Sequence, residues 1–240
     1  MRKRLDILLV EKGLTRSRTL AAGLVRSGQV LINGIQAEKP ALLVSEDVDI
    51  AIKKKPLYVG RGGLKLAHAL LTFGVNVKDF VVADVGASTG GFTDCLLQNG
   101  AQKVYAIDVG HSQLVSELRN DSRVVCMEGV DVRKVSLPEL VDLAVVDVSF
   151  VSVANVLPSI VPLLKKDGSL IILIKPQFEV GKGRLGKGGV VRDKELQDSA
   201  KESVIEKVKS YNLSFSGATP SPILGGSGNK EYLVYFRKNV

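Results

Sequence analysis

The chain has 240 residues, 45% of them hydrophobic, with two cysteines, two histidines and a formal net charge of +8 at pH 7. This length allows one large domain and a second small one, and charged residues and prolines interrupt every apolar stretch before it could span a membrane. The two cysteines have no partner spacing, so they are typical of thiols in a reducing compartment, and we expect a cytoplasmic protein. With only two histidines, a metal site is not expected.

Positive charge is concentrated near the N-terminus, where residues 1–60 contain 11 Lys and Arg against 6 Asp and Glu. The pattern there predicts helices over Arg4–Lys12 and Ser17–Arg26, then a short strand, an Asn-Gly turn and a paired strand over Val48–Ile52. A basic α+β module of this kind suits RNA, although a solvated basic face or an acidic protein partner would fit the same composition. The candidate RNA contacts in this module are Arg4, Arg16, Arg18 and Arg26.

The charged segment Lys53-Lys-Lys-Pro56, which ends in proline, predicts a break between two domains. We therefore expect an RNA-binding domain over residues 1–54, a linker over 55–60 and a catalytic domain over 61–240.

A glycine-rich lead into a helix opens the second domain, over Val59–Leu71. Apolar periodicity predicts that Leu64, Leu66, Leu70 and Leu71 are buried. Lys65 lies among these positions as a candidate catalytic residue, and Arg61 in the lead is a candidate RNA contact.

The strongest motif is Val81-Val-Ala-Asp-Val-Gly-Ala-Ser-Thr-Gly-Gly91, an apolar strand that runs into a glycine turn before a helix. Ligands of open α/β sheets bind at such strand ends. The spacing differs from a dinucleotide fingerprint, and the Gly-Lys-Ser/Thr of a phosphate-binding loop is absent. An acidic residue before the turn suits a ligand with an ammonium group, such as S-adenosylmethionine; an ordinary strand-helix turn is the alternative. The candidate cofactor contacts in this motif are Asp84, Gly86, Ser88, Thr89, Gly90 and Gly91.

Two further apolar strands, Val104–Asp108 and Val124–Glu128, supply more candidate cofactor contacts. Asp108 can accept hydrogen bonds from both hydroxyls of a ribose, with Val109 beside it. Asp131 follows the third strand, where an adenine amino group could be met. A helix cap for Asp108 and a solvated side chain for Asp131 are the alternatives.

Strands and helices alternate to the end of the chain, which predicts an α/β fold. We expect a doubly wound seven-stranded sheet of the Rossmann-like methyltransferase type, with its last two strands antiparallel. The remaining predicted strands are Leu143–Asp147, Ser169–Lys175, Leu213–Ala218 and Glu231–Arg237, and the remaining predicted helices are Val151–Leu164 and Val191–Tyr211.

Four charged residues fall at the edges of these elements: Lys65, Asp147, Lys175 and Glu231. Alkyl transfer to a hydroxyl needs a proton acceptor, and a lysine can serve where burial and neighbouring cations favour its neutral form. We interpret Lys175 as this base and Lys65 as its electrostatic partner, with the two carboxylates orienting the amines. Each residue alone could be a solvated strand edge. Methylation of a nucleic-acid base is the nearest enzymatic alternative, but the motifs that favour it are absent after Asp147.

The segment Gly181–Val191 is a glycine-rich basic loop that follows Lys175 in the chain. We interpret it as a loop that closes over an RNA strand; a disordered surface loop is the alternative. Its candidate RNA contacts are Lys182, Arg184 and Lys187.

Several of these motifs together resemble the hemolysin A family: Gly60-Arg-Gly-Gly-Leu-Lys-Leu66, the glycine turn from Asp84, Asp147-Val-Ser-Phe150, Lys175-Pro-Gln-Phe-Glu179 and Gly228-Asn-Lys-Glu-Tyr232. The N-terminal segment is similar to the αL RNA-binding module, and the remainder resembles FtsJ-type ribose 2′-O-methyltransferases.

The resemblance implies S-adenosylmethionine-dependent methylation of the 2′-hydroxyl of a cytidine in ribosomal RNA, with the small subunit favoured as target. It also implies that the family's catalytic Lys-Asp-Lys-Glu set falls on Lys65, Asp147, Lys175 and Glu231. A membrane-active hemolysin and a non-catalytic RNA-binding protein are the competing interpretations.

Overall fold

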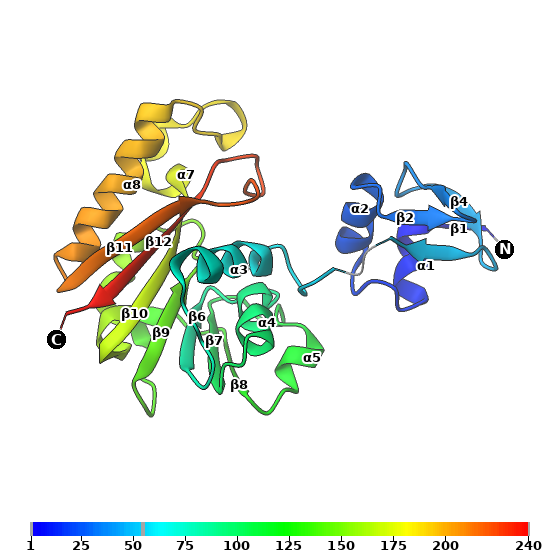
Figure 1. Ribbon diagram of the computed structural model, residues 1–240. Coiled ribbons are helices and arrows are strands. Elements are labelled where there is room, and N and C mark those ends of the chain that lie inside the picture. Colours follow the sequence, from blue (N-terminus) through cyan, green and yellow to red (C-terminus); the bar gives the residue numbers. More distant parts are fainter. Residues whose placement is uncertain (1, 54–55, 240) are drawn as a thin grey trace. The chain divides into compact units, whose positions relative to one another are not determined.

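The computed structural model describes residues 2–53 and 56–239. The chain divides into two compact units, Met1–Pro56 and Leu57–Val240 (Figure 1). Lys54 and Lys55, which belong to the predicted interdomain segment, lie outside the described residues.

The first unit packs two helices against short strands around an apolar core of its own. Its helices are α1 (Leu5–Glu11) and α2 (Arg18–Arg26). β1 (Arg2–Arg4) pairs with β4 (Leu43–Ser45), and β2 (Val30–Ile32) lies between β3 (Ile35–Gln36) and β5 (Ile50–Ile52). The core includes Leu5, Leu9, Val25 and Val30.

Three details of this unit differ from the sequence prediction. The first helix begins at Leu5, because Arg2–Arg4 forms the strand β1, which three consecutive basic residues did not suggest. Ser17 caps α2 by accepting a hydrogen bond from the backbone N–H of Leu20, 3.2 Å away, and so lies outside the helix. The predicted paired strand is confirmed but begins at Ile50.

The second unit is built on one seven-stranded sheet in the order β11-β12-β10-β9-β6-β7-β8. Five strands are parallel, and β12 is antiparallel to both of its neighbours. The predicted doubly wound sheet with an antiparallel last pair is therefore confirmed. The strands are β6 (Val81–Val85), β7 (Lys103–Asp108), β8 (Val124–Glu128), β9 (Val141–Val146), β10 (Leu164–Ile174), β11 (Leu213–Pro220) and β12 (Tyr232–Lys238).

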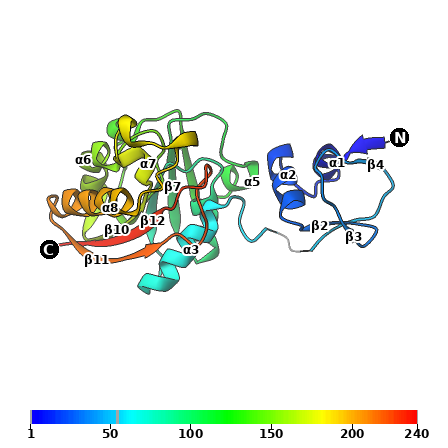
Figure 2. The same ribbon diagram turned by 90° about the horizontal axis from the view of Figure 1, so that it is seen from above.

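Helices cover both faces of this sheet, as Figure 2 shows for α3 on one side and α6 and α8 on the other. The longest is α8, which runs beside the antiparallel edge. The helices of this unit are α3 (Gly62–Phe73), α4 (Gly91–Gln98), α5 (Ser116–Arg119), α6 (Leu157–Ile160), α7 (Pro176–Glu179) and α8 (Lys194–Lys209).

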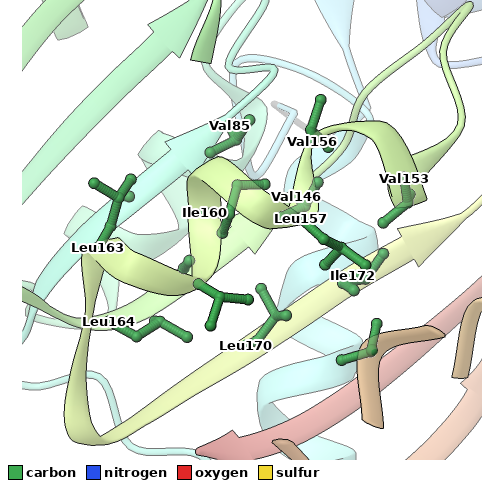
Figure 3. Packing of buried hydrophobic residues seen from close by; sticks show 14 of the residues in the cluster. Val85, Val146, Val153, Val156, Leu157, Ile160, Leu163, Leu164, Leu170 and Ile172 are labelled. Carbon is green, nitrogen blue, oxygen red and sulfur yellow. The ribbon is translucent and has the colours of Figure 1, made fainter. Parts of the chain in front are cut away.

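The interior strand β6 is buried along its whole length because successive side chains pack into the cores on opposite faces of the sheet. Val81 and Val85 contribute to the core on the α6 and α8 side, whereas Val82 packs with α3 and α4. Figure 3 shows Leu157 and Ile160 of α6 packed among valines and leucines of the sheet. Because helices cover both faces of the sheet, its polar residues are exposed at the ends of the strands.

Two predictions about helices are wrong. The predicted helix Val151–Leu164 is broken into short turns around α6, because Pro158 and Pro162 each start a new turn and cannot donate a backbone hydrogen bond. In α3, Leu64 and Leu71 are 43% and 84% exposed, since the core contacts fall on the other side of the helix, at Leu66 and Leu70.

Candidate active site

The turn between β6 and α4 brings two strand ends into close contact. Gly86 has a φ of +86°, and its N–H donates to the carbonyl of Ile107 on β7 over 2.8 Å. A Cβ at Gly86 would lie 2.5 Å from the backbone oxygen of Asp147, which follows β9. Only glycine fits this approach without a backbone shift, so the turn and Asp147 are held at one place on the sheet edge.

The carboxylate of Asp108 organises the same turn. Its two oxygens accept hydrogen bonds from the backbone N–H groups of Ser88, at 2.8 Å, and Gly110, at 2.7 Å. It therefore ties the end of β7 to the glycine turn after β6, with the carboxylate at the rim of the adjoining cavity.

This cavity, which we call the first pocket, has a volume of about 530 Å³, within the usual range for small-molecule sites. Its polar wall includes three carboxylates, and its apolar wall includes valines from three loops. The lining includes Gly86, Ser88, Asp108, Val109, Val130, Asp131, Val132, Asp147, Ser149 and Phe150.

Asp131 in the first pocket is already paired. Its carboxylate accepts hydrogen bonds from the side chain of Arg133, at 2.9 Å, and from the same residue's backbone N–H. The Arg133 guanidinium holds the pKa of Asp131 well below its usual range, at about 2. Asp131 is thus an ionised acceptor at the pocket wall.

Asp84 is fully buried behind the turn. One carboxylate oxygen accepts a hydrogen bond from the hydroxyl of Thr93, at 2.6 Å, and the other has no hydrogen-bond partner. Burial raises the pKa of Asp84 to about 7. The predicted ammonium-binding carboxylate therefore lies beneath the lining of the pockets.

Two lysine-carboxylate pairs join elements that are distant in the sequence. Lys65 on α3 donates to Glu231, just before β12, over 2.5 Å, and both side chains are buried. Lys175 follows β10 directly, and its Nζ lies 2.6 Å from Oδ1 of Asp147 in an ion pair whose angles do not make a hydrogen bond. The same Nζ donates a hydrogen bond to the hydroxyl of Ser149 at 2.7 Å. The four residues that the sequence singled out thus form two close pairs.

A second pocket, of about 700 Å³, lies beside the first, and the two share Ser149 and Phe150 in their walls. Lys175 and Glu231 line the second pocket, whereas Asp147 lines the first. The Lys175–Asp147 pair therefore spans the two pockets, and the Lys65–Glu231 pair reaches the second pocket through Glu231. Other lining residues of the second pocket are Gln177, Phe178, Gly181, Leu185, Gly189, Gly226 and Ser227.

Comparison with known families agrees with this arrangement. Residues 58–238 match the model of the FtsJ-like methyltransferases. The chain belongs to the FtsJ-like methyltransferase family. Residues 3–50 match the S4 domain, so this FtsJ-like methyltransferase carries an S4 domain in its first unit.

Individual relatives are similar over almost the whole chain. The 16S/23S rRNA (cytidine-2′-O)-methyltransferase TlyA of Mycobacterium tuberculosis is 43% identical over 98% of this chain and 90% of its own. Hemolysin A of Brachyspira hyodysenteriae is 40% identical over 97% of this chain and 99% of its own. A solved structure described as a hemolysin from Streptococcus thermophilus is 40% identical, with a TM-score of 0.79 over 99% of this chain and 89% of that one. Within residues 2–53 and 56–239, we find no helix long and apolar enough to cross a membrane.

The predicted cofactor contacts of this FtsJ-like methyltransferase fall into three groups. Gly86, Ser88, Asp108, Val109 and Asp131 line the first pocket. Thr89 and Gly91, together with Gly86 and Ser88, line a smaller third pocket that also includes Asp147. Asp84 and Gly90 line none of the three; a Cβ at Gly90 would meet the side chains of Leu114 and Leu118 instead.

Two of the predicted RNA contacts of the S4 unit share one carboxylate. Arg4 and Arg18 lie 2.8 Å and 3.4 Å from the carboxylate of Asp6, a buried side chain. The hydrogen bond from Arg4 lowers the pKa of Asp6 to about 2. Arg16 and Arg26 are exposed.

In the second unit, Arg61 donates to the backbone carbonyl of Leu224. Arg184 is exposed in the glycine-rich loop. The side chains of Lys182 and Lys187 lie outside those that the structure describes.

The sequence did not indicate three polar residues that belong to this site. Ser149 accepts a hydrogen bond from Lys175. Gln177 lines the second pocket, and its side-chain oxygen has no hydrogen-bond partner. Asn229 is buried two residues before Glu231. Uncharged polar side chains are common in loops, so a sequence does not distinguish those with a role at a site. Their role can be recognised only from the residues that they contact. The one available signal was position, because all three lie within two residues of a predicted catalytic residue.

Proposed function

We propose that this chain transfers a methyl group from S-adenosylmethionine to the ribose 2′-hydroxyl of a cytidine in ribosomal RNA. The observation that carries the proposal is the Lys175–Asp147 contact that spans the two pockets, with the Lys65–Glu231 contact reaching the second pocket through Glu231. Support for the substrate comes from the family match and from relatives named as rRNA (cytidine-2′-O)-methyltransferases.

The first pocket suits the cofactor in size and in chemistry. Asp108 at its rim offers carboxylate oxygens to a ribose diol, and Val109 and Val132 offer apolar contacts for an adenine ring. Asp131, ionised and fixed by Arg133, would accept a hydrogen bond from an adenine amino group. We place the glycine-turn residues Gly86, Ser88, Thr89, Gly90 and Gly91 around the methionine end, with the Asp84 carboxyl buried beneath the turn.

Bound there, the cofactor would supply an electrophilic methyl on a sulfonium. With its own proton passed to the Asp147 carboxylate, the Nζ of Lys175 would accept the hydroxyl proton while the 2′-oxygen bonds to the methyl carbon in place of sulfur. Asp147 and Ser149 fix this amine in position, and Glu231 does the same for Lys65. Holding the reacting atoms in line supplies much of the rate, on the order of several kcal/mol.

We propose that residues 1–54 bind RNA, that 55–60 link the domains and that 61–240 carry the catalysis. The S4 match and the excess of basic residues in the first unit support RNA binding. We assign the small-subunit rRNA as the target, with phosphate contacts from Arg4, Arg16, Arg18, Arg26, Arg61, Lys182, Arg184 and Lys187.

The test is transfer of labelled methyl to naked rRNA and to ribosomal subunits by wild type and by Lys175→Ala, followed by digestion and mass analysis of the nucleoside. We expect 2′-O-methylcytidine from wild type and a loss of about 10²-fold or more in kcat for the variant, as for removal of a general base. Lys175 is preferred to Lys65 as the target, since removing Lys65 would leave the buried Glu231 unpaired.

Lys165→Ala is the matched control. Lys165 lies at the other end of β10 and is likewise paired with an aspartate, Asp142, at 2.6 Å, so the same chemical change is made far from the pockets. A base-methylated nucleoside would overturn the assigned reaction, and equal losses in both variants would overturn the role of Lys175.

A further inference from the structure

The glycine-rich loop Gly181–Val191 forms part of the wall of the second pocket, through Gly181, Leu185 and Gly189. Its internal backbone hydrogen bonds are local, such as those from Gly189 to Gly186, at 3.0 Å, and from Gly186 to Val190, at 3.1 Å. Bonds of this kind shape the loop without fixing it against the sheet. Its position over the pocket therefore depends on contacts with other segments.

Asn229 supplies such contacts from the loop between β11 and β12. Its side-chain amide donates to the carbonyl of Gly189 at 3.0 Å, and its side-chain oxygen accepts from the N–H of Val191 at 2.9 Å. The residue is only 1% exposed. A buried amide that satisfies one carbonyl and one N–H of the same segment holds that segment in a single register.

Val191 is fixed from its other side by Gln197 on α8. The Gln197 amide donates to the carbonyl of Val191 at 2.6 Å, and its oxygen accepts from the hydroxyl of Tyr232 at 3.2 Å. Both backbone groups of Val191 are thus bound by buried side-chain amides. The loop ends at an anchored residue.

The same asparagine shapes the turn that leads to Glu231. The backbone oxygen of Asn229 accepts from the N–H of Gly225 at 2.9 Å, and a Cβ at Gly225 would lie 2.3 Å from the Glu231 carboxylate. Gly226 and Ser227 in this turn also line the second pocket. Asn229 thereby contacts the glycine-rich loop through its side chain and the turn before Glu231 through its backbone.

We propose that Asn229 is a positioning residue that fastens the glycine-rich loop to the β11–β12 turn, so that the two together form the RNA-binding wall of the second pocket. This inference rests on the proposed function for its substrate, because the pocket junction is where the target nucleotide would enter. Asn229 touches neither cofactor nor reacting atoms and acts through the loop.

The experiment uses the full chain with Asn229→Asp. The carboxylate keeps the acceptor for Val191 but places an oxygen against the Gly189 carbonyl, so the loop should detach. We expect hydrogen exchange over residues 181–191 to become about tenfold faster, and KM for rRNA to rise about tenfold, while kcat changes by less than about threefold and cofactor affinity by less than about twofold.

Asn120→Asp is the matched control, since Asn120 is exposed at the end of α5. It should change neither loop exchange nor KM. If Asn229→Asp fails to fold, Gln197→Leu tests the same anchor from α8 and should also raise both exchange at Val191 and KM.

Unchanged loop exchange or an unchanged KM would overturn the inference. So would a parallel loss of cofactor affinity, RNA affinity and melting temperature, which would mark Asn229 as a residue of general stability. If wild type methylates no RNA, the proposed function fails instead; RNA affinity by filter binding, measured with loop exchange in the same variants, then decides the role of Asn229.

Discussion

Buried polar side chains are few in the described part of this chain, and most of those in the second unit lie at the candidate site or support it. Lys65 and Glu231 could be singled out from the sequence because charges at predicted strand and helix edges are unusual near buried positions. Asn229 and Gln197 could not, because their roles depend on partners 38 and 6 residues away in loops of unpredicted shape. Charge is visible in a sequence, whereas hydrogen-bond geometry is not.

Asp84 gives a pH-dependent stability that can be measured. Its pKa is raised by burial to about 7, so between its usual pKa and about 7 the folded chain holds a proton that the unfolded chain has released. The free energy of unfolding should therefore fall as the pH rises through this window. Asp6 and Asp131, with a pKa of about 2, titrate below it.

We expect Asp84→Asn to abolish this part of the pH dependence, since an amide can still accept from Thr93 and carries no charge. Urea unfolding of both proteins at about pH 5.5 and about pH 8 measures it, and the difference between them cancels other titrating groups. An equal pH dependence in both proteins would refute the assignment to Asp84.

At the scale of elements, the fold could be predicted well because each of the five parallel strands carries its own apolar run. Elements whose bounds depend on side-chain caps or on tertiary pairing were placed less well. The predicted helix Val191–Tyr211 is observed as α8, Lys194–Lys209, because Asp193 caps it by accepting from the backbone N–H groups of Glu195 and Leu196. Likewise β1 exists through its pairing with β4, which local propensity does not reveal.

Removing the cap of α8 should destabilise the chain. Asp193→Ala loses both hydrogen bonds to the first turn and should lower the free energy of unfolding by about 1 kcal/mol in urea titrations. Asp193→Ser restores an acceptor at the same position and should recover most of that loss. Equal stability of Asp193→Ala and wild type would mean that solvent satisfies these N–H groups equally well.

At the scale of the whole molecule, each of the two units has a hydrophobic core of its own. The sequence indicated this division through its basic N-terminal region and the lysine-rich break. It placed Lys65 and Glu231, 166 residues apart, in one catalytic set but did not indicate which carboxylate contacts which lysine. The Lys65–Glu231 contact arises because β12 inserts between β10 and β11 and brings Glu231 to the sheet edge where α3 begins.

Separate cores predict separable activities. A chain that begins at Leu57 should keep its cofactor affinity within about twofold but lose about tenfold or more in RNA affinity, with a shallower dependence on salt because fewer phosphates are neutralised. Calorimetric titration of cofactor and filter binding of rRNA over a range of salt concentrations measure the two effects against the full chain. Undiminished RNA affinity would assign RNA binding to the second unit alone.

The position of β12 within the sheet has a consequence for the timing of synthesis. β12 follows every other strand of this sheet in the sequence and yet is an interior strand, with β11 on one side and β10 on the other, directly after Glu231. A nascent chain that stops short of it leaves Lys65 without its carboxylate partner. The proposed enzyme would thus complete its Lys65–Glu231 pair only after translation has passed β12.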